Sequence, residues 1–119
     1  MFDFLLMDRS VLFGIALKEA AAMRGFRLYD HQGDLEEGLS FARELQPKVL
    51  LICPEGWDDQ WVQNLNADEI GSKIPTVIIL ESSAIEFEAD ISTAQVLVVR
   101  KPLSPLDLMG QLALIIGQS

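Results

Sequence analysis

The stretch KVLLICPEGW, residues 48–57, contains the pattern that decides the fold. Four apolar residues, from Val49 to Ile52, run without a polar interruption and end at Cys53, after which a loop with Pro and Gly begins. Such a run is typical of a strand that is covered on both faces, as in a parallel sheet. Ligands of parallel α/β sheets bind beyond the carboxyl ends of the strands, so Cys53 stands where functional residues are expected.

Similar apolar runs alternate with helical patterns along the rest of the chain. The strands are predicted at residues 2–7, 26–29, 49–52, 76–80 and 96–99. The helices are predicted at residues 11–24, 34–46, 58–70 and 104–116, and residues 81–95 show only a weak helix signal. Strict strand–helix order with short connections favours a doubly wound, five-stranded parallel sheet of the flavodoxin-like α/β class.

The ends of the helices carry the clearest local signals. Ser10 suits an N-cap and Gly25 suits a helix stop, and Ser104 followed by Pro105 is a strong helix start. Trp61 and the leucine four residues later are expected to form a core pair of the third helix. In the first helix, helical spacing predicts one broad face against the core, formed by Val11, Leu12, Ile15, Ala16, Ala20 and Met23.

Length and charge limit the classes of function. The 119 residues fit a single domain, 1–119, and the formal net charge is −9. A surface of that charge repels phosphate backbones and anionic lipids, so we expect neither nucleic acid nor membrane as a partner. The apolar runs are too short to span a bilayer, the start lacks a basic segment, and a single cysteine favours a cytoplasmic protein.

The residues themselves give little indication of a catalytic site or a metal site. Cys53 lacks the following arginine of a cysteine phosphatase loop and the second cysteine of a dithiol site. His31 is the only histidine, so a zinc cluster is not expected. We interpret Cys53 as a partly buried packing residue and expect no enzymatic activity.

Residues 5–26, 46–53, 74–80 and 96–116 together resemble the receiver domains of bacterial response regulators, the CheY-like proteins of two-component phosphorelays. The Lys–Pro turn at Lys101 and Pro102 with its following helix cap is the most specific part. The resemblance implies a site in which acids after the first strand bind Mg²⁺, an aspartate after the third strand accepts a phosphoryl group, and a lysine contacts it. Asp8 matches one of those acids and Lys101 matches the lysine.

The remaining positions of that site depart from the pattern of the receivers. Arg9 replaces the second acid, and Cys53 replaces the phosphorylated aspartate. Leu80 or Glu81 takes the place of the Thr or Ser that ends the fourth strand, and Val98 replaces an aromatic residue. Phosphoryl transfer to such a site requires a carboxylate nucleophile and a divalent cation. We therefore expect a pseudo-receiver that has lost Mg²⁺ binding, with an Asp8–Lys101 ion pair in place of the metal.

A pseudo-receiver is expected to act through protein contacts. The resemblance implies a partner, or self-association, at the face that receivers build from their fourth helix, fifth strand and fifth helix. In this chain that face corresponds to parts of residues 86–95, the strand at 96–99 and the helix at 104–116, and it carries Arg100 and Leu103. An exposed Trp57 is a further candidate. One alternative is a receiver that is phosphorylated on another acid, such as Glu55, or tuned by oxidation of Cys53. A weaker alternative is a domain that binds a nucleotide or another small molecule.

Overall fold

The computed structural model describes residues 2–8, 10–54, 57, 60–68, 73–80, 96–100 and 104–117, and within them five strands form one parallel sheet. The strands are β1 (Phe4–Met7), β2 (Leu28–His31), β3 (Val49–Ile52), β4 (Thr76–Leu80) and β5 (Val96–Arg100). The helices are α1 (Val11–Met23), α2 (Leu35–Leu45), α3 (Gln60–Ala67) and α4 (Pro105–Gly117). The strand order is β2-β1-β3-β4-β5, which confirms the doubly wound flavodoxin-like fold.

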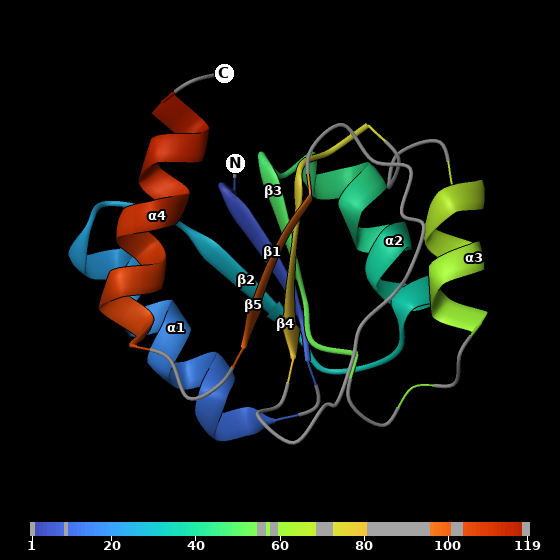
Figure 1. Ribbon diagram of the computed structural model, residues 1–119, viewed down its shortest axis with the longest axis horizontal. Helices are drawn as coiled ribbons and strands as arrows, with labels where there is room; N and C mark the ends of the chain where they lie inside the picture. Colours follow the sequence, from blue (N-terminus) through green and yellow to red (C-terminus); the bar gives the residue numbers. More distant parts are fainter. Residues whose placement is uncertain are drawn as a thin grey trace.

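Two helical layers enclose the sheet. Figure 1 shows α1 and α4 against one face and α2 and α3 against the other. Phe4 and Leu6 of β1 pack toward α1 and α4, whereas Leu5 and Met7 pack toward α2 and α3, as the alternation of side chains along a strand requires. The central strands β1 and β3 are buried along their whole length, which explains their unbroken apolar sequences.

Strand β2 begins two residues later than predicted. Gly25 has a φ of 79°, and the Phe26 N–H donates to the carbonyl of Ala21 (2.9 Å), so Phe26 still belongs to the turn that ends α1. The ring of Phe26 packs edge-on against Phe4 with centroids 5.3 Å apart. The strand therefore includes Asp30, which the sequence pattern had placed beyond its end.

The predicted core face of α1 is wrong in most of its members. The residues of α1 that are buried are Gly14, Leu17, Ala20 and Ala21. Of the predicted set, only Ala20 is among them, and Val11, Leu12, Ile15 and Met23 are at least half exposed. The helix is apolar on nearly every side, so periodicity does not choose a face. The small side chains let the helix approach the sheet closely, and that contact decides the orientation.

The other helices follow their signals more closely. Asp34 caps α2 by accepting the Glu37 N–H (2.9 Å), and Ser104 caps α4 by accepting the Asp107 N–H (3.3 Å). Helix α3 is shorter than predicted, but Trp61 is buried as expected. Residues 81–95 lie outside the described part of the chain. None of the described helices is long and apolar enough to cross a membrane.

Candidate functional site at the carboxyl edge of the sheet

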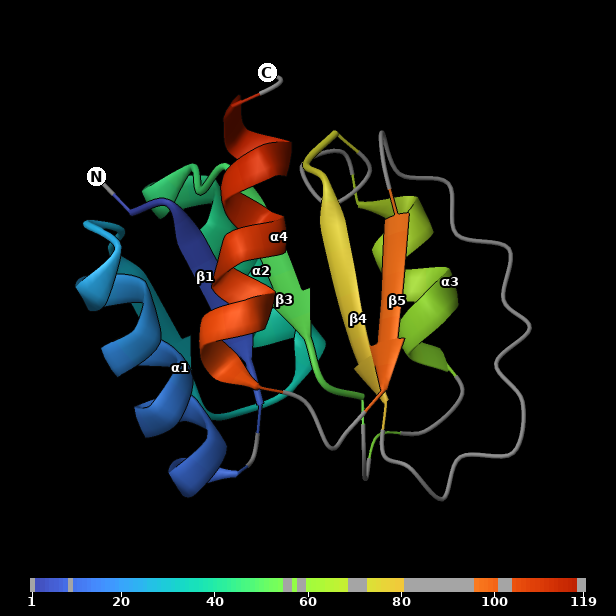
Figure 2. The same cartoon turned by 60° about the vertical axis from the view of Figure 1, so that its left-hand side comes forward.

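The candidate site lies where the chain direction across the sheet reverses, between β1 and β3. In Figure 2 the tips of the labelled strands point to the same edge. Met7 pairs with both His31 of β2 and Ile52 of β3, so the next residues, Asp8 and Cys53, leave the sheet side by side. The Asp8 N–H donates to the His31 carbonyl (3.1 Å) and the Cys53 N–H donates to the Met7 carbonyl (3.0 Å). Ligands of doubly wound sheets bind at this switch point.

Asp8 is held by the turn that enters α1. The Ser10 N–H donates to Asp8 Oδ1 (3.0 Å), while the Ser10 hydroxyl oxygen accepts the Phe13 N–H (3.4 Å) and caps the helix. Asp8 is only 4% exposed, and its Oδ2 is buried without a hydrogen-bond partner among the described residues. Its backbone and one carboxylate oxygen are therefore fixed, and the second oxygen is left to face the site.

Asp30 is a second acid at this edge, and the sequence analysis interpreted it only as an ordinary polar strand exit. It pairs in register with Leu6, two residues before Asp8, so alternation places both carboxylates on the α1 side of the sheet. Asp30 Oδ1 is also buried without a hydrogen-bond partner in the described part of the chain. Burial, and secondly the charge of Asp8, raise the pKa of Asp30 above its ordinary value, against smaller opposing effects of Gln32, Lys18 and His31.

The backbone of α1 provides the space for Asp30. A Cβ at Gly14 would overlap the Asp30 carboxylate and lie 2.7 Å from its Cγ. Glycine in the interior of a helix costs about 1 kcal/mol relative to alanine, so its presence there has to be explained by its surroundings. Gly14 within a helical pattern was the signal that could have pointed to a close contact of this helix.

Cys53 is enclosed in the apolar core that faces α1 and α4. It is 2% exposed and belongs to the same cluster as Leu6 and Leu51. A reactive thiol needs access to its reagent and electropositive surroundings. Cys53 lacks that access in this structure, and the acids Asp8 and Asp30 lie on the same side of the sheet.

Only some of the other predicted site residues lie in the described part of the chain. Leu80 ends β4 with a buried apolar side chain, so the last described residue of that strand carries no hydroxyl. Arg100 ends β5 and is exposed, as is Val98. Several predicted residues lie outside the described part of the chain, namely Arg9, Glu55, Glu81, Lys101, Pro102 and Leu103. The proposed Asp8–Lys101 ion pair consequently stays a prediction.

Trp57 is half-buried, in contrast to the exposed position expected for a binding residue. Its ring packs edge-on against Trp61, with centroids 6.1 Å apart. The indole Nε1 is buried and has no acceptor among the residues that the structure describes. Trp57 thus covers the edge of α3 and contributes to the core on that side of the sheet.

His31 points to the opposite side of the sheet from Asp8 and Asp30. It packs against Phe41 with ring centroids 5.0 Å apart, and its Nε2 lies 3.7 Å from Glu37 Oε2. Nε2 is buried without a hydrogen bond among the described residues. His31 therefore cannot serve as a base for Cys53, which faces α1 and α4.

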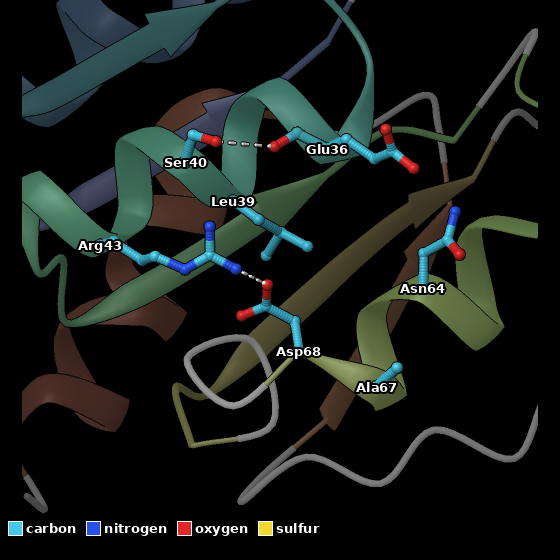
Figure 3. A pocket seen from close by; sticks show the side chains of 7 residues that line it. All are labelled: Glu36, Leu39, Ser40, Arg43, Asn64, Ala67 and Asp68. Atoms are coloured by element: carbon cyan, nitrogen blue, oxygen red, sulfur yellow. Dashed lines mark hydrogen bonds and ion pairs between the residues drawn. The ribbon is translucent and has the colours of Figure 1, made fainter.

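A pocket of about 340 Å³ lies away from this edge, between α2 and α3 (Figure 3). Leu39 forms part of its lining, and Arg43 is paired with Asp68 across it. Glu36 adds a second acid. Among the described residues that line the pocket, the one cation, Arg43, is already paired with Asp68, and Glu36 adds a negative charge, so this lining gives no support to the nucleotide-binding alternative.

A magnesium ion fits the described residues poorly. Mg²⁺ prefers oxygen ligands in octahedral geometry. Asp8 offers one free carboxylate oxygen, but Cys53 supplies a soft sulfur where a third-strand carboxylate would stand. Within the described part of the chain, no three His, Cys, Asp or Glu side chains are grouped as metal ligands. The carboxylate of Asp30 is packed against Gly14 of α1 and comes from β2, so it does not replace the carboxylate that is missing after β3.

No family model and no curated protein sequence matches the chain. Several solved structures do match the chain in their fold. A response regulator receiver modulated diguanylate cyclase from Pelobacter carbinolicus is 14% identical with a TM-score of 0.73, over 99% of this chain and 94% of that one. The chemotaxis response regulator CheY4 of Vibrio cholerae is 16% identical with a TM-score of 0.70, over 97% and 98%. The chain has the receiver fold.

A pseudo-receiver domain is also among the structural neighbours. The pseudo-receiver domain of the CikA protein is 23% identical with a TM-score of 0.59, and 94% of each chain is covered. Identities this low carry the fold and not the chemistry, so the function has to be argued from the site.

Proposed function

We propose that this protein is a pseudo-receiver, which transmits a signal by binding a protein partner and is not switched by phosphorylation. The observation that carries the proposal is the residue after β3. A receiver accepts a phosphoryl group on a carboxylate at that position, and here the position holds the buried thiol of Cys53. The thiol gives neither the oxygen nucleophile nor the second ligand that a cation would need.

Two further features support the loss of phosphoryl chemistry. Leu80 places an aliphatic side chain at the tip of β4, where a hydroxyl would donate to a phosphoryl oxygen. Asp30 lies on the same side of the sheet as Asp8, but its carboxylate comes from β2 and packs against Gly14, so it does not stand in for the missing acceptor after β3. We infer from these features that the site neither binds Mg²⁺ nor catalyses a reaction.

The proposed partner surface includes the exposed end of β5. Val98 and Arg100 are exposed on this strand, which forms one edge of the sheet. The exposed side chains of these two residues can contact another protein. The single cysteine is consistent with a reducing compartment, and we propose that the protein acts in the cytoplasm of a bacterium.

Exposure to a small phosphodonor tests the proposal directly. The protein would be incubated with acetyl phosphate and Mg²⁺, and separately with beryllofluoride, and then followed by intact mass and thermal denaturation. We expect no phosphoryl adduct and no stabilisation. An adduct on Asp8, Asp30, Glu55 or any other acid would overturn the proposal in favour of an active, unusual receiver.

Matched variants test which positions cause the proposed loss of phosphorylation. Cys53→Asp restores a carboxylate at the acceptor position, and Cys53→Asp with Arg9→Asp restores both missing acids. Cys53→Ser serves as the control because it adds an oxygen without a carboxylate. The double variant should gain the adduct if the loss lies at these positions, and the serine variant should stay unmodified. Oxidation of the wild-type protein with peroxide should leave Cys53 unmodified while the fold persists.

A further inference from the structure

The pocket between α2 and α3 takes no part in the site at the carboxyl edge of the sheet. Leu39 of α2, which is 3% exposed, gives it a buried apolar surface, and Ala67 at the end of α3 adds a second one. Pockets for small ligands range from about 300 to 1,000 Å³, so a volume of about 340 Å³ lies at the lower end of that range. The pocket therefore has room, and apolar surface, for one long side chain.

The polar groups of the pocket differ in what they leave for a ligand. The Arg43 guanidinium is paired with the Asp68 carboxylate, so these two charges balance each other. Figure 3 shows Glu36 and Asn64 on the other side of the pocket from that pair. Neither of these two side chains has an ion-pair or hydrogen-bond partner among the described residues. A ligand therefore meets one unbalanced negative charge and acceptor oxygens from two helices.

We propose that this pocket binds an arginine side chain of a protein partner. The inference rests on the proposed function, in which the protein acts through protein contacts, and it gives one of those contacts a definite chemistry. A guanidinium carries five N–H donors in one plane, so it can donate to the Glu36 carboxylate and the Asn64 amide oxygen together. The aliphatic stem of the arginine then packs on Leu39, as the stems of long basic side chains do on apolar surfaces.

Charge and exposure favour this occupant over other ligands. The chain carries a net charge of −9, which attracts cationic groups and repels anionic ones. Glu36, Ser40 and Arg43 are exposed, so the pocket is open to solvent on the α2 side and would leave a free small molecule partly hydrated. A side chain that belongs to a protein makes further contacts around the pocket, and these add to its affinity. A lysine offers a compact, strongly hydrated ammonium, which matches two separated acceptors less well.

Titration of the isotope-labelled protein with the peptide acetyl-Gly-Arg-Gly-amide tests the pocket. A single exposed charged contact is weak, so the peptide is added to about 20 mM at low ionic strength and followed by amide chemical shifts in nuclear magnetic resonance. The shifts should saturate and should be largest for residues 36–43 and 64–68. The side-chain amide of Asn64 should be among the signals that move.

Two control peptides separate recognition of arginine from general attraction by an acidic protein. Citrulline in place of arginine keeps the shape and removes the charge, whereas lysine keeps the charge and removes the planar group. Each should bind at least about 3-fold more weakly than the arginine peptide. Equal affinity for the arginine and lysine peptides would overturn the proposal. So would shifts that spread over the acidic surface without saturation, because both results would reflect net charge alone.

Variants of the pocket assign the binding to its lining. Glu36→Gln removes the unbalanced charge and should weaken binding of the arginine peptide by roughly 2- to 5-fold. Ala67→Phe fills the pocket without a change of charge and should weaken binding at least as much. Glu44→Gln is the matched control, because Glu44 is an exposed acid of α2 that does not line the pocket. All three side chains are exposed, so circular dichroism should show an unchanged fold. Equal effects of Glu36→Gln and Glu44→Gln would contradict the proposal.

The peptide titration and the phosphodonor assay fail separately. The pocket lies between α2 and α3, and neither Asp8 nor Cys53 lines it. A phosphoryl adduct together with specific binding of the arginine peptide would overturn the pseudo-receiver and keep the pocket. The absence of an adduct together with no saturable binding of the peptide would keep the pseudo-receiver and overturn the pocket.

Discussion

At the scale of single residues, Gly14 and Asp30 act as one unit. The glycine lies in the interior of α1, and the carboxylate of Asp30 occupies the space that a Cβ would fill. The pattern of the sequence placed Asp30 at the exit of a strand and gave it no role. A contact between a helix and a strand 16 positions apart depends on how closely they pack, which periodicity does not specify.

Replacement of Gly14 by alanine should destabilise the protein by about 1–3 kcal/mol, although alanine is the better helix former. The added methyl group has to displace the Asp30 carboxylate. Chemical denaturation of Gly14→Ala, Asp30→Ala and the double variant measures the effect. In the Asp30→Ala background the same methyl group should be neutral or stabilising by up to about 1 kcal/mol. An equal loss in both backgrounds would show that the clash is not with Asp30.

Replacement of Asp30 by asparagine should stabilise the protein at neutral pH. The pKa of Asp30 is raised in the folded state, so the folded protein holds this proton more tightly than the unfolded chain. Stability from this group is therefore present below the ordinary aspartate pKa of about 4 and is lost as pH rises through the folded-state value. Melting temperatures of Asp30→Asn and wild type should differ at pH 7 and converge as the pH falls to about 4. A difference that grows on acidification would contradict this account.

At the scale of the elements, helix and strand identities were predictable and their orientations were not. The apolar run of β3 gives its boundaries correctly because it is buried on both faces. Helix α1 was predicted in the right place with the wrong face inward, because its sequence is apolar all round. The inward face is the one that carries Ala20 and Ala21, because their small side chains let the helix pack closely against the sheet. Such a fit depends on the surface of the sheet as well as on the helix.

Removal of the Asp34 cap should weaken α2 by about 1 kcal/mol. Asp34 Oδ1 accepts the Glu37 N–H at 2.9 Å, whereas the corresponding bond of Ser10 in α1 is longer, at 3.4 Å. Urea denaturation of Asp34→Ala and Ser10→Ala should therefore give the larger loss for Asp34→Ala. Equal losses would mean that the length of the capping bond does not determine its contribution here.

At the scale of the whole molecule, the doubly wound parallel sheet followed from connection rules and from the resemblance to receivers. The positions of Asp8 and Cys53 at the switch point could be predicted, since each directly follows a central strand. The burial of both side chains, and the acid of β2 beside them, could not be predicted, because these depend on the twist and packing of three strands together.

Magnesium should stabilise the protein no more than sodium does. A chain with a net charge of −9 gains stability from any salt, because ions screen its self-repulsion. Melting temperatures in MgCl₂ and NaCl at matched ionic strength should agree within about 1 °C, because a bound ligand adds stability only in proportion to its occupancy. The variant with Cys53→Asp and Arg9→Asp is the control, and it should respond more to Mg²⁺. A saturating, magnesium-specific gain in the wild type would refute the loss of the metal site.

The edge-on contact of Trp57 and Trp61 has a spectroscopic consequence. These are the two tryptophans of the chain, so the intrinsic emission excited at long wavelength comes from one corner of the molecule, beside α3. Emission therefore reports local unfolding beside α3 and does not report on α1, which lies on the other side of the sheet. A fluorescence melting curve that coincides with far-ultraviolet circular dichroism shows that both sides unfold together, and an earlier fluorescence transition shows that the α3 side opens first.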